Sequence, residues 1–173
     1  MSKRYYYYVE GECEEALINA LKKDPAKINP GRVKVWNVIE KVLPDSILRT
    51  IQPGSTVVFV FDTDVQRTGN LEKNIQQVKK YAGKVVVVLL PQVMNLEDEL
   101  KRSTDVKEIT ELTKSKSRSD FKRDFCHITD LRKTLDTHKL DINKLWCQPL
   151  PKGFEVFSPF TSNRKLILIK CKK

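Results

Sequence analysis

Long hydrophobic runs are absent from this chain of 173 residues. The longest, residues 57–61 and 85–91, have the length of strands, whereas a membrane-spanning helix needs about 20 consecutive apolar residues. The first residues, Met-Ser-Lys-Arg-Tyr, lack the apolar segment of a secretory signal. We therefore expect a cytoplasmic protein that has no membrane partner.

Cysteine and histidine are scarce, with four and two residues, and no Cys-x-x-Cys pair occurs. Scattered cysteines in a cytoplasmic protein are expected to be reduced thiols rather than a disulfide framework. A zinc site could in principle be built from an adjacent Cys-His pair and two residues further on, but neither the adjacent pair nor the other gaps match common zinc-finger spacings, which disfavours structural zinc. These residues are Cys126, His127, His138 and Cys147.

Acidic residues are outnumbered, since 22 Asp and Glu stand against 32 Lys and Arg and give a net charge of +10. Such an excess favours binding to nucleic acid, because cations neutralise phosphates and release counterions. A basic surface that binds no polyanion is the alternative. The hydrophobic content of 40% is sufficient for the core of a single domain.

Strand and helix patterns alternate through the first hundred residues. Apolar or β-branched stretches at 5–9, 32–36, 56–61 and 84–90 predict four strands, the last stopped by Pro91. Apolar residues at helical spacing follow the first and third strands, the second of these helices capped by Asn70, and short helical pieces are expected within 38–51. This order predicts an α/β fold, a Rossmann-like, mainly parallel sheet of about four strands with helices on both faces.

After Pro91 the pattern becomes mostly helical, with predicted helices at 97–100, 106–113, 119–128 and 131–135. The apolar stretch 166–169 predicts one late strand at a sheet edge. We expect residues 1–100 to form the α/β core and residues 101–173 to form a helical extension packed on it within the same globular unit.

Carboxylates stand at the ends of two predicted strands: Glu10 follows the first, and Asp62 and Asp64 follow the third. Ligands of such sheets gather at the carboxyl ends of the strands, so the three groups converge if these strands are neighbours. Clustered carboxylates need a cation or partial protonation, and hard oxygen ligands suit Mg²⁺ or Mn²⁺. Gly11 would let the chain turn sharply and let a phosphate come close.

The sequences Val-Glu-Gly-Glu-Cys-Glu at 9–14 and Val-Val-Phe-Val-Phe-Asp-Thr-Asp at 57–64 resemble the Toprim domain. The Toprim signature is a Glu, usually in Glu-Gly, after the first strand and an Asp-x-Asp after the third. The family includes topoisomerases, bacterial primases, OLD-type nucleases and ribosomal-RNA maturation nucleases. The resemblance covers about residues 5–100 and extends to small Toprim proteins of phage-defence and mobile-element contexts.

The resemblance implies a Toprim-like fold and a role for each matching residue. Glu10 would be a metal ligand or general acid/base at the scissile phosphate, and Asp62 and Asp64 would hold Mg²⁺. Glu14 is a candidate for a further ligand. Glu97, or one of its acidic neighbours, is the candidate that completes a second metal site, as an acidic residue after the fourth strand does in OLD-like members.

The chain also departs from the larger family members. It has no room for the separate domain that carries the topoisomerase tyrosine, and it lacks the zinc-binding region of primases and the ATPase domain of OLD nucleases. A stand-alone nuclease therefore remains, or a Toprim subunit whose partner, such as an ATPase, is encoded separately.

A basic, serine-rich loop at 114–119 and the residues after it are candidates for binding nucleic-acid phosphates. Phe121 and Phe125 have helical spacing, which favours core packing over stacking on bases. The candidate phosphate-binding residues are Lys114, Lys116, Arg118, Lys122 and Arg123.

Three functions stay open. The first is a Mg²⁺-dependent Toprim nuclease acting on DNA or RNA. The second is a phosphatase of haloacid-dehalogenase type, which also places Asp-x-Asp after an apolar strand, although Gln66 stands where that family usually has Thr or Val. The third is a Toprim module that senses or scaffolds without cleaving.

Overall fold

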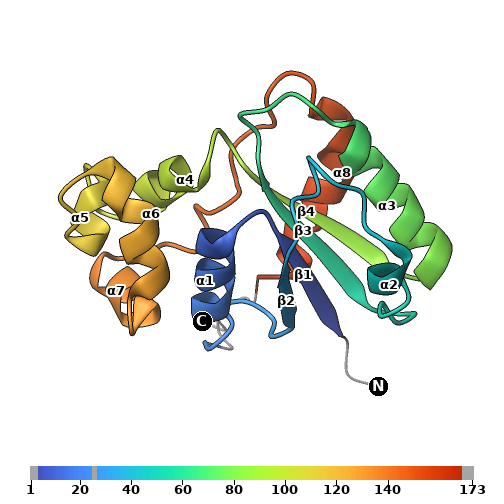
Figure 1. Ribbon diagram of the computed structural model, residues 1–173, viewed down its shortest axis with the longest axis horizontal. Helices are drawn as coiled ribbons and strands as arrows, with labels where there is room; N and C mark the ends of the chain where they lie inside the picture. The colour runs from blue at the N-terminus through green and yellow to red at the C-terminus, as the bar shows by residue number, and fades with distance from the viewer. Residues whose placement is uncertain (1–3, 25–26, 169–173) are drawn as a thin grey trace.

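The computed structural model describes residues 4–24 and 27–168. Its centre is a four-stranded sheet that is parallel throughout and has the strand order β2-β1-β3-β4, so β1 and β3 are neighbours (Figure 1). The predicted α/β class and the parallel sheet of four strands are confirmed. The strands are β1 (Tyr5–Val9), β2 (Arg32–Val35), β3 (Thr56–Asp62) and β4 (Val86–Gln92).

Helices cover both faces of the sheet, as predicted (Figure 1). One face is covered by α1 (Glu12–Leu21), beyond which lie α4 (Leu96–Ser103), α5 (Ile109–Thr113), α6 (Arg118–His127) and α7 (Leu131–Thr137). The other face is covered by α2 (Asp45–Leu48), α3 (Gly69–Ala82), η1 (Glu155–Phe157) and α8 (Ser158–Thr161), and η2 (Ser162–Leu166) follows along β4.

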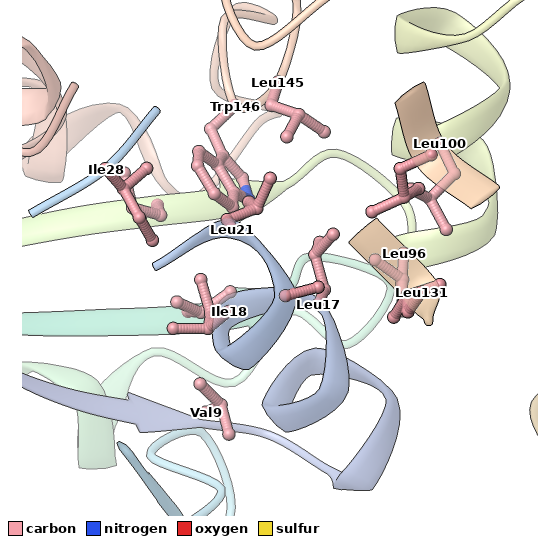
Figure 2. Close-up of a cluster of buried hydrophobic side chains, with 14 of the residues drawn as sticks. Val9, Leu17, Ile18, Leu21, Ile28, Leu96, Leu100, Leu131, Leu145 and Trp146 are labelled. Atoms are coloured by element: carbon pink, nitrogen blue, oxygen red, sulfur yellow. The ribbon is translucent and has the colours of Figure 1, made fainter. Parts of the chain in front are cut away.

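The two faces have separate hydrophobic clusters because successive strand residues point to opposite sides. In β3, Val58 and Val60 join the α1 side, whereas Phe59 and Phe61 join the α3 side. Burial on both faces explains why this strand is continuously apolar from Val57 to Phe61. Figure 2 shows the first cluster, in which Leu17 of α1 points toward side chains of α4 and α7. The C-terminal helices therefore pack directly on α1.

Asn74 of α3 is fully buried and fixes the segment that follows β2. Its side chain accepts a hydrogen bond from the Leu43 amide (2.7 Å) and donates to the carbonyls of Val38 (3.1 Å) and Lys41 (3.0 Å). The prediction that Asn70 caps α3 is wrong, because the cap is Thr68. Asn70 instead donates to backbone carbonyls of the same segment.

Two strand predictions are also wrong. Pro91 does not stop β4, which pairs through Pro91 to Gln92; a proline is tolerated because β4 is an edge strand and needs no ladder donor there. No late strand forms among the described residues of 166–169: Leu166 ends η2, Leu168 makes only an isolated antiparallel bridge to Ile28, and residue 169 lies outside the described part. The free edge of β4 is already covered by η2.

Helix boundaries after β4 differ from the expected ones. The segment predicted at 106–113 is helical only from Ile109, because Glu108 is the N-cap and its amide bonds the Glu111 carboxylate.

Within the described ranges, no helix is both long and apolar enough to cross a membrane.

Gly31, just before β2, offers a test of this packing. A Cβ there would lie 2.5 Å from the Tyr5 carbonyl oxygen and 2.8 Å from Cε2 of Tyr7. We expect Gly31→Ala to lower the free energy of unfolding by about 1–3 kcal/mol, because the contact is with backbone and a buried ring. The control Gly69→Ala, where nothing lies within 4 Å, should change it by less than about 0.5 kcal/mol. Urea unfolding measures both, and equal losses would contradict this packing.

Candidate functional site

Glu10 and Asp62 meet at the carboxyl edge of the sheet. The parallel pairing of β1 with β3 runs to Val9 opposite Val60, so the residues that follow leave the sheet side by side. The backbone amide of Asp62 donates a hydrogen bond to Oε2 of Glu10 (2.9 Å). One carboxylate is thus held beside the backbone of the other.

Thr63 anchors the turn between Asp62 and Asp64. Its side chain is buried, its amide donates to the Gln92 carbonyl (3.1 Å), and its hydroxyl accepts from the Met94 amide (3.0 Å). Asp62 therefore stays partly buried at the end of β3, whereas Asp64 is exposed.

Two pockets flank the pair, and both are lined by Glu10 and Asp62. The α6 pocket, 470 Å³, lies between α1, α4 and α6 and adds Gly11, Glu12, Cys13, Glu14, Leu96, Glu97, Lys122, Arg123, Cys126 and His127. The α3 pocket, 650 Å³, lies between the segment after β2 and the start of α3 and adds Asn37, Ile39, Glu40, Lys41, Asp64, Val65, Arg67, Gly69 and Asn70.

Asp62 is electrostatically strained. Burial, followed by the charges of Glu14, Glu10, Asp64 and Glu97, raises its pKa to about 8. Its Oδ1 is buried and has no hydrogen-bond partner among the described residues. A buried acceptor without a partner is unfavourable, and a bound cation would remove both the unmet hydrogen bond and the repulsion.

The pKa values of Glu10 and Glu14 are raised as well, in both cases mainly by burial. Hydrogen bonds from backbone amides oppose this effect: the Gly11 amide donates to Oε2 of Glu14 (2.9 Å) as α1 begins. A Cβ on residue 11 would lie 3.1 Å from the same oxygen, so the absence of a side chain at Gly11 leaves room for the Glu14 carboxylate.

The donor set fits a hard divalent ion, since it consists of carboxylates and includes the unsatisfied Oδ1 of Asp62. The expected convergence of Glu10, Asp62 and Asp64 is incomplete, however. Over residues 4–24 and 27–168, no three His, Cys, Asp or Glu side chains lie close enough together to hold one ion. Because like charges repel one another, a bound cation would have to draw the carboxylates together.

Glu97 and Glu99 of α4 have different surroundings. Glu97 lines the α6 pocket, where its Oε1 lies 3.6 Å from Nζ of Lys122. Glu99 is fully buried and accepts bonds from the amides of Val93 (3.2 Å) and Trp146 (3.0 Å) and from Arg102 (2.8 Å). Glu99 thus has a structural role, because it joins α4 to the backbone at Val93 and Trp146. Glu97 is the candidate ligand that lines the pocket.

Only two of the five predicted phosphate-binding residues line a pocket beside Glu10 and Asp62. Lys122 and Arg123 line the α6 pocket, although Arg123 also pairs with Asp120 and Asp124. The remaining three, Lys114, Lys116 and Arg118, line neither pocket, and Arg118 pairs with Glu108 at 2.9 Å.

Two cationic residues of the α3 pocket, Lys41 and Arg67, were not identified from the sequence. Neither forms an ion pair with a described residue. Arg67 follows Asp64 by three residues at the carboxyl end of β3. Its place in a loop at that edge is the signal that could have found it.

The zinc candidates do not assemble. Cys126 and His127 line the α6 pocket, whereas His138 lies 3.3 Å from Asp105 and Cys147 is exposed. Phe121 and Phe125 are fully buried with ring centroids 5.2 Å apart, so the expectation of core packing is confirmed.

Comparison with protein-family models and with curated proteins found no match. The Toprim resemblance therefore depends on the two short motifs around Glu10 and Asp62, together with the sheet that brings them side by side.

Stability should depend on pH through Asp62. Its folded pKa, about 8, exceeds the ordinary value near 4, so between these pH values the unfolded state loses the proton and the folded state keeps it. The free energy of unfolding should therefore fall as pH rises from 4 to 8. In metal-free buffer, Asp62→Asn should remove this pH-dependent loss. The free energy of unfolding of the variant should exceed that of wild type by about 2–4 kcal/mol at pH 8 and differ little from it at pH 4.

The matched control is Glu72→Gln on the exposed side of α3, which should follow wild type at both pH values. Urea unfolding in chelator provides the measurement. An Asp62→Asn variant that is equally or less stable than wild type at pH 8 would show that Asp62 is not strained.

Proposed function

We propose that this protein is a Mg²⁺- or Mn²⁺-dependent nuclease of Toprim type, which cleaves phosphodiester bonds of DNA or RNA. The observation that carries the proposal is Asp62: its buried Oδ1 has no partner in the described structure, and its amide bonds the Glu10 carboxylate. A polar atom buried among carboxylates at the ligand-binding edge of a parallel sheet is what a metal site requires.

In this proposal Glu10, Asp62 and Asp64 hold the ion, and Glu14 and Glu97 in the α6 pocket hold a second one or orient water around the first. A bound ion would stabilise the charge that develops on the phosphate during cleavage. The role of Glu10 as ligand or as general acid/base comes from the resemblance. The chain's own contribution is to hold these carboxylates beside one another on two neighbouring strands.

The two pockets suggest how a strand of nucleic acid lies across the site. The pockets meet at Glu10 and Asp62, and each contributes two cations: Lys122 and Arg123 on one side, Lys41 and Arg67 on the other. Phosphates on either side of the cleaved bond would be held by these groups. Such contacts position the backbone without reading its sequence.

Two alternatives make different demands on the same site. A non-enzymatic Toprim module, working with a separately encoded ATPase in phage defence or on a mobile element, would bind metal and nucleic acid and leave the polymer intact. A haloacid-dehalogenase-like phosphatase would hydrolyse small phosphate esters. The paired cationic pockets favour an extended polyanion over a small ester.

Cleavage is tested with single- and double-stranded DNA and RNA in Mg²⁺, Mn²⁺ or chelator. Wild type should cleave at least one polymer only when metal is present. Glu10→Gln and Asp62→Asn should each lower the rate by about 10²–10³-fold, because each removes metal-held charge stabilisation worth several kcal/mol. Glu72→Gln should retain full activity.

Metal-dependent binding of nucleic acid without cleavage would support the non-enzymatic module. Hydrolysis of a simple phosphate ester, with no polymer cut, would support the phosphatase. Either result contradicts the nuclease.

The proposal that a nucleic-acid strand lies across both pockets is tested by measuring the affinity of a fluorescent oligonucleotide at several salt concentrations in Ca²⁺. Arg67→Ala and Lys122→Ala should each weaken binding by about 3–10-fold and reduce the salt slope by about one unit, because each removes one phosphate contact. Lys116→Ala, an exposed lysine outside both pockets, should leave affinity unchanged. A larger loss for Lys116→Ala would place the strand on the basic loop.

A further inference from the structure

Two thiols that are 113 residues apart in the sequence lie in contact on one wall of the α6 pocket. Cys13 stands in the first turn of α1 and Cys126 near the end of α6, and their sulfur atoms are 3.0 Å apart. Both side chains are half-buried and line the pocket. Cys147 is exposed and its thiol donates to the Lys144 carbonyl, and Cys171 lies outside the described residues.

We propose that Cys13 and Cys126 are a modification site, at which a low-molecular-weight disulfide such as oxidised glutathione drives formation of a reversible disulfide between α1 and α6. The proposal does not depend on the nuclease activity. It would make the α6 pocket sensitive to the thiol redox state of its surroundings.

The geometry requires little movement. A disulfide joins two sulfurs at about 2.05 Å, so the present separation must shrink by about 1 Å. The Cys13 thiol also lies 3.4 Å from the Lys122 carbonyl, so the two helices are already in contact at this level. Because both cysteines line the pocket and neither is fully buried, we expect a dissolved oxidant to reach the sulfurs from it.

The reaction balances without any group from the chain beyond the two thiols. One thiolate attacks a sulfur of oxidised glutathione, which forms a mixed disulfide and releases one glutathione. The second thiolate then attacks the protein sulfur of that mixed disulfide and displaces a second glutathione. The two protons pass to the released glutathiones, and the two electrons given up by the protein thiols reduce the oxidant.

The bond would tie α1 to α6, and both helices contribute residues to the lining of the pocket. Cys13 is flanked by Glu12 and Glu14, and Cys126 lies one turn beyond Lys122 and Arg123. Oxidation would therefore fix these cations relative to the acidic wall. Because the sulfurs border a pocket instead of a sealed core, glutathione can also reduce the bond.

The test equilibrates the purified full-length protein in glutathione buffers of increasing oxidised fraction and then counts alkylatable thiols by mass spectrometry. We expect the count to fall from four to two and digestion to give one peptide pair linked through Cys13 and Cys126. Tm should rise on the order of 10 °C, because the bond closes a long loop of the unfolded chain, and excess reduced glutathione should reverse the change.

Cys147→Ser is the matched control and should show the same linked pair and the same rise in Tm. Cys13→Ser and Cys126→Ser should each abolish both changes. The linked peptide is measured on wild type, so the test stands even if a variant folds poorly. Four alkylatable thiols at every buffer ratio, a link through other cysteines, or a stable mixed disulfide of glutathione with Cys13 or Cys126 would overturn the proposal.

Discussion

The parallel pairing of β1 with β3 determines where the side chains of the sheet and of the candidate site lie. Both strands are buried on both faces, so a shift of register by one residue would move every side chain into the wrong cluster. The register places the end of β1 beside the end of β3 and holds the Glu10 carboxylate against the Asp62 amide. Apolar packing thereby offsets the cost of bringing like charges together, and the raised pKa of Asp62 expresses that cost.

The helices on either face divide the space around this pair. On one side, α1 and the C-terminal helices α4 and α6 build the α6 pocket; on the other, α3 and the segment held by Asn74 build the α3 pocket. Residues from the C-terminal half of the chain thus line one of the two pockets. The Cys13–Cys126 contact lies where the two parts of the chain meet.

The strands and the acidic pair could be predicted from the sequence because their signals are local: burial on both faces gives continuous apolar runs, and parallel strands end at one edge. Features that depend on tertiary contacts could not. Pro91 is tolerated only because β4 is an edge strand, and Asn70 bonds a distant segment instead of capping its helix. The shared pocket of Lys41 and Arg67 and the contact between the two thiols likewise follow from packing between elements far apart in sequence.

The proposed nuclease requires the carboxylate of Asp62 to be a metal ligand. Anomalous scattering from crystals of the protein soaked in Mn²⁺ tests it most directly. We expect a peak within about 2.0–2.4 Å of Oδ1 of Asp62, with a Glu10 or Asp64 carboxylate oxygen also bound. A map with no peak at this edge of the sheet, while Oδ1 of Asp62 stays without a ligand at saturating Mn²⁺, would contradict it.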